Sequence, residues 1–105
     1  MSKFKIKQVD DFKLPISFIM PNGEEAKFTF TVKHKRAKDV ANLFNLEADK
    51  LPTDVEFIKM FATGWDLEEE FNDENLQDLV DFFPGCVASF SHTYTSALAG
   101  NRVKN

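Results

Sequence analysis

The spacing of apolar residues changes once along this 105-residue chain, and the change limits the folds that it can adopt. Residues 26–33 alternate apolar and polar side chains, which is the period of a strand with one buried face. From about residue 37 the apolar residues recur at intervals of three and four, as in an amphipathic helix. The sequence therefore predicts an α+β fold in which a small N-terminal antiparallel β-hairpin or sheet packs against about four short C-terminal helices.

A turn sequence separates the two predicted strands. Residues 14–20 and 26–33 flank Pro21-Asn22-Gly23-Glu24, which is typical of a hairpin turn. Phe4, Ile6 and Val9 alternate in the same way, so the N-terminal residues are a candidate third strand. Because an isolated hairpin is only marginally stable in water, we expect this sheet to rest on the helices that follow.

The first two predicted helices are short. The first runs from about residue 37 to residue 48. The second begins at Thr53, which forms a capping-box pattern with Glu56, and runs to about Ala62. Gly64 is expected to end it in the left-handed conformation. The side chains expected to face inward are Ala37, Val40, Ala41 and Phe44 in the first helix, and Val55, Ile58 and Phe61 in the second.

Two more helices are predicted on either side of a proline. Asn72 or Asp73 is expected to cap the third helix, and Pro84 to end it. The last helix is expected to start at once and to stop at Gly100. The inward side chains are expected to be Leu76, Leu79, Val80 and Phe83 in the third helix, and Val87, Phe90, Tyr94 and Leu98 or Ala97 in the fourth.

The length predicts one domain over residues 1–105, with a β-rich part (1–33), a helical part (37–100) and a flexible tail (101–105). Cys86 is the single cysteine, so no intramolecular disulfide is possible. The first residues lack the apolar core of a signal peptide, and no apolar run is long enough to span a membrane. We therefore expect a cytoplasmic protein without a membrane partner.

Twelve phenylalanines accompany one tryptophan and one tyrosine, so they either fill the core or leave rings free for a partner. Charge is also unevenly distributed. Residues 1–38 carry a net charge of +5 and residues 39–105 a net charge of −9. This asymmetry favours head-to-tail self-association or a basic partner, and two solvated surfaces are the alternative.

No grouping of residues indicates catalysis, a metal or another cofactor. His34 lies among basic residues, and His92 has only serine neighbours that do not form a triad. The acidic run at residues 66–74 lacks the spacing of a calcium loop, which favours a solvated face. The basic run at residues 33–38, with Phe28 and Phe30 as stacking rings, is the best candidate for nucleic acid. The acidic isoelectric point of about 5.1 opposes that interpretation, so we expect no nucleic-acid partner and no enzymatic activity.

The order of residues between 62 and 105 resembles the tail assembly chaperones of long-tailed bacteriophages. The landmarks are Gly64, Trp65, Asp66, Phe71, Asn75, Leu76, Leu79, Phe83, Pro84, Phe90, Tyr94 and the terminal Lys104-Asn105. Over residues 1–61 the resemblance is one of architecture alone.

The resemblance implies a non-enzymatic chaperone of phage or prophage origin. Such a protein binds and solubilises the tape measure protein in the host bacterial cytoplasm, is released as the tail tube polymerises, and is absent from the mature virion. The tail tube protein and further copies of the chain are the other expected partners. Alternatives are a small structural tail completion or connector protein, or a nucleic-acid-binding adaptor.

The helical part is expected to carry most of the partner recognition. Trp65 precedes an acidic segment in a connector, where either a core residue or an exposed binding anchor is expected. Phe82 lies off the inward stripe of its helix, which is typical of a contact with a partner. The positions expected to contact or support a partner are Trp65, Phe71, Leu76, Leu79, Phe82 and Phe83.

Overall fold

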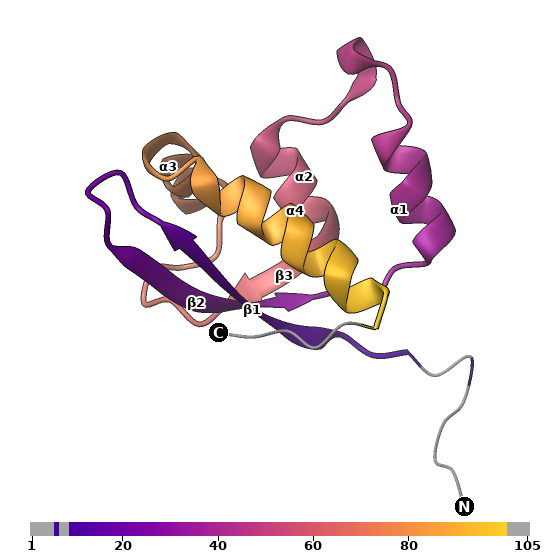
Figure 1. Cartoon of the computed structure of the whole chain (residues 1–105), viewed down its shortest axis with the longest axis horizontal. Helices are drawn as coiled ribbons and strands as arrows, with labels where there is room; N and C mark the ends of the chain where they lie inside the picture. The colour runs from indigo at the N-terminus through magenta and orange to yellow at the C-terminus, as the bar shows by residue number, and fades with distance from the viewer. Residues whose placement is uncertain (1–5, 7–8, 101–105) are drawn as a thin grey trace, which may run out of the picture.

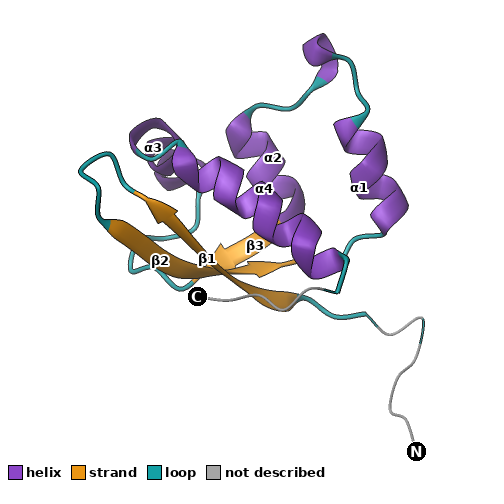
Figure 2. Ribbon diagram, viewed as in Figure 1, coloured by secondary structure: helices purple, strands orange, loops and turns teal. Residues whose placement is uncertain are grey.

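The computed structural model of this chain describes residue 6 and residues 9–100, and it has the predicted α+β architecture (Figure 1). A three-stranded antiparallel sheet is covered on one face by helices (Figure 2). The elements are β1 (Phe12–Ile19), β2 (Glu25–Val32), α1 (Ala37–Phe44), the 3-10 turn η1 (Ala48–Lys50), α2 (Asp54–Phe61), β3 (Ala62–Trp65), α3 (Asp73–Phe82) and α4 (Gly85–Leu98). The predicted tail at residues 101–105 lies outside the described residues.

The predicted hairpin is confirmed, with ends that differ from the prediction by one or two residues. β1 and β2 pair with Leu14 opposite Phe30 and Ile16 opposite Phe28. Gly23 in the connecting turn has a φ of 91°, which glycine adopts at little cost. The alternation of side chains along both strands places their apolar residues on the face that the helices cover.

The third strand comes from a different part of the chain than predicted. Phe4 lies outside the described residues, whereas Ile6 and Val9 are exposed and belong to no strand. β3, at Ala62–Trp65, supplies the third strand and pairs antiparallel with β2. Four residues that include a glycine carry little strand signal, so this pairing depends on contact with β2 rather than on local pattern.

Gly64 does not end α2 in the left-handed conformation, as was expected. It lies within β3 opposite Thr31, and it is not among the residues with positive φ. The helix ends because the backbone at Ala62 is already extended, with φ −94° and ψ 142°. The chain thus passes directly from α2 into β3, and the β2 pairing determines the conformation of Gly64.

The inward face of α1 also differs from the prediction. α1 ends at Phe44, before the separate η1 turn, instead of continuing to residue 48. Val40 is buried as expected, but its buried partner is Leu43, and Ala37, Ala41 and Phe44 are exposed. Apolar residues cover a wide arc of this short helix, so its sequence allows two docking faces. Packing on the rest of the molecule selects the Val40–Leu43 edge.

The predicted caps of α2 and α3 are confirmed, whereas Leu79 and Phe83, which were expected to face inward, are only partly buried. The Thr53 hydroxyl accepts a hydrogen bond from the Glu56 N–H (3.2 Å), and the Glu56 carboxylate accepts one from the Thr53 N–H (2.9 Å). The side chain of Asn72 caps α3 by accepting from the Asn75 N–H at 2.8 Å. These bonds satisfy N–H groups that have no partner within the helix.

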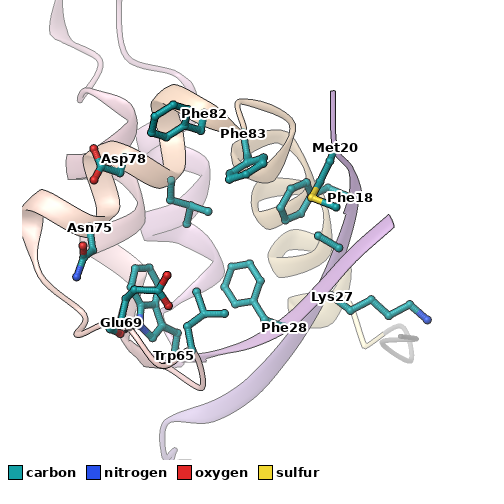
Figure 3. A pocket seen from close by; sticks show the side chains of 13 residues that line it. Phe18, Met20, Lys27, Phe28, Trp65, Glu69, Asn75, Asp78, Phe82 and Phe83 are labelled. Atoms are coloured by element: carbon teal, nitrogen blue, oxygen red, sulfur yellow. Dashed lines mark hydrogen bonds between the residues drawn. The ribbon is translucent and has the colours of Figure 1, made fainter. Parts of the chain in front are cut away.

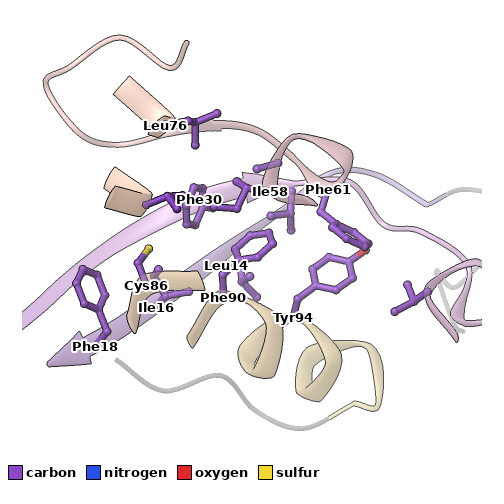
Figure 4. Close-up of a cluster of buried hydrophobic side chains, with 14 of the residues drawn as sticks. Leu14, Ile16, Phe18, Phe30, Ile58, Phe61, Leu76, Cys86, Phe90 and Tyr94 are labelled. Atoms are coloured by element: carbon purple, nitrogen blue, oxygen red, sulfur yellow. The ribbon is translucent and has the colours of Figure 1, made fainter. Parts of the chain in front are cut away.

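The core lies between the sheet and the helices, and it combines aliphatic side chains with a group of contacting aromatic rings (Figure 4). Phe30 and Phe90 lie 4.9 Å apart between ring centroids, and Phe61 and Tyr94 lie 4.7 Å apart. Among the described phenylalanines, only Phe44 and Phe82 are exposed. Most of the rings therefore stabilise the fold, and few remain available to a partner.

Candidate functional site

An open apolar groove of about 420 Å³ lies between the end of the hairpin and α3 (Figure 3). One wall comes from β1, β2 and the adjoining turn, and consists of Phe18, Met20, Ala26, Lys27 and Phe28. The other comes from β3, the loop after it and α3, and consists of Trp65, Leu67, Glu69, Asn75, Asp78, Leu79, Phe82 and Phe83. Its volume is within the usual range of ligand-binding pockets.

The hairpin wall continues the apolar face of the sheet beyond the core. Phe28 precedes the fully buried Phe30 by two residues in β2, so the two side chains lie on the same face of the sheet. The Phe28 ring contacts Phe18 edge-on with centroids 6.3 Å apart, and it also contacts Trp65 edge-on at 6.3 Å. The groove is therefore the part of the sheet's inner face that remains accessible.

α3 presents different side chains to the core and to the groove. Leu76 and Val80 are buried in the core. Asn75, Asp78, Leu79 and Phe82 line the groove, and their spacing of i, i+3, i+4, i+7 makes them one continuous stripe along the helix. Phe82, at the end of this stripe, is 67% exposed. α3 thus presents a partly apolar stripe along one side of the groove.

Trp65 supports the groove from one side. Its indole N–H donates a 2.7 Å hydrogen bond to the carbonyl oxygen of Glu69, and its ring packs edge-on against Phe71 at 5.0 Å. The Asn75 side chain donates a 2.7 Å bond to the carbonyl oxygen of Glu70. These contacts hold the loop between β3 and α3 in place, so Trp65 is a partly buried residue that also forms part of the wall.

The six predicted partner-binding residues occupy three different positions. Trp65, Leu79, Phe82 and Phe83 line the groove. Phe71 lies against Trp65 but is not part of the lining, and Leu76 is fully buried in the core. The sequence did not indicate Phe18, Met20 and Phe28 of the opposite wall as contacts for a protein partner, although Phe28 was considered as a base-stacking ring. Their alternation signalled a buried face, but no sequence signal shows where the helices stop covering that face.

The segment that forms the α3 side of the groove is strongly acidic. Residues 64–83 contain eight Asp and Glu and no Lys or Arg. Within the described part of the chain, only Asp73 of these eight forms an ion pair, with Lys59 at 2.6 Å. Lys27 on the hairpin wall pairs instead with Glu25, at 3.8 Å. The groove is therefore apolar inside and negatively charged along the side formed by α3.

Other reactive side chains lie outside the groove. Cys86 is buried, and this burial raises the pKa of its thiol to about 12, so it remains protonated near neutral pH. His34 contacts Phe12 edge-on at 5.8 Å, and His92 is exposed on α4. Over residues 9–100 and at residue 6, no three His, Cys, Asp or Glu side chains are grouped so as to hold a metal ion.

The basic run at residues 33–38 is attached to the last helix. The Tyr94 hydroxyl donates to the Lys33 carbonyl at 2.7 Å and accepts from the Lys35 N–H at 3.1 Å. Phe30, which was considered as a base-stacking ring, is fully buried, and Phe28 is half-buried in the groove. The Phe30 ring is therefore unavailable for stacking on a base.

An open apolar groove with acidic side chains along one side is typical of a surface that binds another protein. The model of the phage tail assembly chaperone family matches residues 1–105, so the chain belongs to that family. The match covers the whole chain, whereas the resemblance in the sequence could be followed residue by residue only from position 62 onward. No curated protein and no solved structure matches the chain.

Membership of this family gives the chain a chaperone role, which is non-enzymatic, with phage tail proteins as partners. In the part of the chain that the structure describes, none of the helices has the length and hydropathy needed to cross a membrane.

Proposed function

We propose that this protein binds the tape measure protein in the host cytoplasm and keeps it soluble while the phage tail assembles. Tail tube subunits then displace the chaperone as they polymerise around the tape measure protein, so the chaperone is absent from the mature virion. Family membership and the apolar groove next to α3 support this proposal. The groove is the observation that carries it, because it is an accessible apolar surface formed by well-packed elements.

The form of the groove suits temporary binding. It is open, and Leu79 and Phe82 of α3 line one side of it. Such a surface covers a few apolar side chains of a client helix with many modest contacts, which favours release. The surrounding carboxylates add charge to the complex and thereby help to keep it in solution.

The predicted partner-binding residues have different roles in this proposal. Leu79 and Phe82 contact the client directly, because they lie on the α3 stripe that faces the groove. Trp65 and Phe83 form walls, whereas Phe71 and Leu76 support those walls from behind. Self-association through the oppositely charged halves of the chain belongs to the same proposal.

Co-expression with the tape measure protein from the same genome tests the proposal. We expect the tape measure protein to become more soluble and to purify together with this chain. The variant Phe82→Ser should reduce the co-purified amount, because it removes the most exposed ring of the groove. Ile19→Ser is the matched control, since Ile19 is 63% exposed on β1 but does not line the groove.

Two outcomes would contradict this function. Co-expression without any gain in solubility and without co-purification would exclude binding of the client. Detection of the chain by mass spectrometry in purified virions would instead indicate the structural alternative, a tail completion or connector protein, because a released chaperone leaves no copies in the particle.

A further inference from the structure

The two charged regions of this protein lie at opposite ends of the molecule. Figure 1 shows α3 and the hairpin turn at one end of the long axis, which extends over 49 Å, and α1 near the other end. α1 follows the basic side chains of Lys33, Lys35 and Arg36 and contains Lys38. Four of the eight acidic side chains of residues 64–83 belong to α3, at the other end. Two copies placed end to end therefore bring opposite charges together.

α1 has a stripe that its own fold covers only in part, since the Phe44 ring packs against Phe57 at 6.1 Å but remains 49% exposed. Val40 and Leu43 face the body of the protein, whereas Ala37, Ala41 and Phe44 are exposed. The exposed three are spaced i, i+4, i+7, so they form one line along the helix. Small alanines followed by one ring allow another helix to approach closely. This stripe is narrow enough to enter an open groove.

α1 and α3 are complementary in the order of their side chains. α1 carries Arg36 and Lys38 at its start and Phe44 at its end, with Asp39 as its one carboxylate. α3 carries Asp73 and Glu74 at its start and Phe82 at its end. With a rise of roughly 1.5 Å per residue, both helices separate the charged start from the ring by about 12 Å. Side by side in parallel, they pair cations with carboxylates and ring with ring.

We propose that α1 of one copy lies in the groove of the next, along the α3 stripe, and that copies thereby associate head to tail. The contact joins two different surfaces, so repeating it builds either an open row of copies or a closed ring. The inference rests on the proposed function in one respect, the use of the same groove. It adds that a second copy covers the groove until a client replaces it.

Sedimentation of the purified full-length chain tests this contact without any client. We expect concentration-dependent association at low ionic strength, and weaker association as salt screens the charges between α1 and α3. A chain that remains monomeric at low salt over the whole concentration range would overturn the proposal. So would association that does not change with salt.

Charge reversal identifies the surfaces that meet. The variants R36E/K38E and E74K/D78K change side chains that are all exposed, so circular dichroism should show an unchanged fold. Each variant alone should have its association weakened by at least about tenfold, because like charges then meet at the contact. An equimolar mixture of the two should associate again, since every α1 then meets a groove of opposite charge.

The mixture is the decisive sample. Recovery of association assigns the contact to α1 and the groove, because net charge alone cannot produce it. If the mixture stays monomeric, or if either variant alone associates like the unmodified chain, the proposal is wrong.

Phe44→Ser should also weaken association. Ile19→Ser should not, because Ile19 is exposed on β1 and does not line the groove. None of these measurements involves the tape measure protein. Self-association can therefore be disproved while co-expression still shows client binding, and client binding can be disproved while self-association is observed.

Discussion

The hydroxyl of Tyr94 on α4 donates a 2.7 Å hydrogen bond to the carbonyl oxygen of Lys33, which is 61 residues earlier in the chain. The same hydroxyl accepts a bond from the N–H of Lys35. Tyr94 is almost fully buried, and burial raises the pKa of its hydroxyl while the Lys35 bond opposes the rise. One polar atom within an aromatic core thus attaches the last helix to the segment between β2 and α1.

Tyr94→Phe should destabilise the protein although it removes a single oxygen. The Lys33 carbonyl and Lys35 N–H lose a partner in a partly buried place, which costs about 1–3 kcal/mol of unfolding free energy. For a domain of this size, we expect a fall in the melting temperature of roughly 4–8 °C per kcal/mol. Calorimetry measures the fall, with the exposed His92→Gln on the same helix as control. Equal melting temperatures for Tyr94→Phe and the unmodified chain would show that the hydroxyl contributes no net stability.

The capping box of α2 predicts a dependence of stability on pH. Hydrogen bonds from the backbone and side chain of Thr53 hold the pKa of Glu56 below its ordinary value of 4.5. The bonds therefore stabilise the folded state above that ordinary pKa, and the contribution is lost as the pH falls through the lower pKa of the folded protein. We expect the difference in denaturation midpoint between the unmodified chain and Glu56→Gln to change in this acidic range. A difference that is constant with pH would contradict the ionised cap.

Gly64 and Gly100 should respond differently to alanine. Gly64 has no positive φ, and no atom lies within 4 Å of the position of an added Cβ, so Gly64→Ala should be neutral or stabilise by about 0.4–1 kcal/mol. Gly100 has a φ of 88°, where an alanine is strained, so Gly100→Ala should destabilise by about 1 kcal/mol. Urea denaturation of both variants measures the effects. A larger loss at Gly64 than at Gly100 would mean that Gly64 does adopt a left-handed conformation.

Leu76 and Phe82 lie on the same helix, but substitutions at the two positions should affect different properties, stability at Leu76 and client binding at Phe82. Leu76 is fully buried, so Leu76→Ala should cost about 2–5 kcal/mol of stability. Phe82 is mostly exposed, so Phe82→Ala should stay within about 0.5 kcal/mol of the unmodified chain while it lowers client recovery. Denaturation and co-purification should be measured on the same preparations. A Phe82 variant as unstable as the Leu76 variant would place Phe82 in the core.

Much of the fold follows from local signals. The alternation in β1 and β2, the turn at Gly23, the caps at Thr53 and Asn72 and the stop at Gly100 all depend on residues close together in the sequence. The errors at the third strand, at Gly64 and at the docking edge of α1 have a different cause, which is contact between segments far apart in the chain. β3 is a strand because it pairs with β2. α1 has apolar residues on two sides, but only the side with Val40 and Leu43 packs against the rest of the protein.

The groove was predictable in part. The sequence singled out Leu79, Phe82, Phe83 and Trp65, because rings beside an acidic segment indicate a surface for a partner. It could not separate these from Leu76, which is part of the same apolar pattern but is fully buried. Phe18 was missed, and Phe28 was considered only as a base-stacking ring, because nothing in β1 or β2 shows where the helices leave the sheet uncovered.

The sequence by itself determined the order of strands and helices, the unequal distribution of charge and the family resemblance, because these depend on neighbouring residues and on composition. The tertiary structure alone decided which rings are sealed, which strand completes the sheet and where the apolar face remains open. These features depend on contacts between segments far apart in the chain. Leu76 is buried and Phe82 is exposed because of how α3 lies against the sheet. Both residues are apolar, so their types alone do not show which of them is buried.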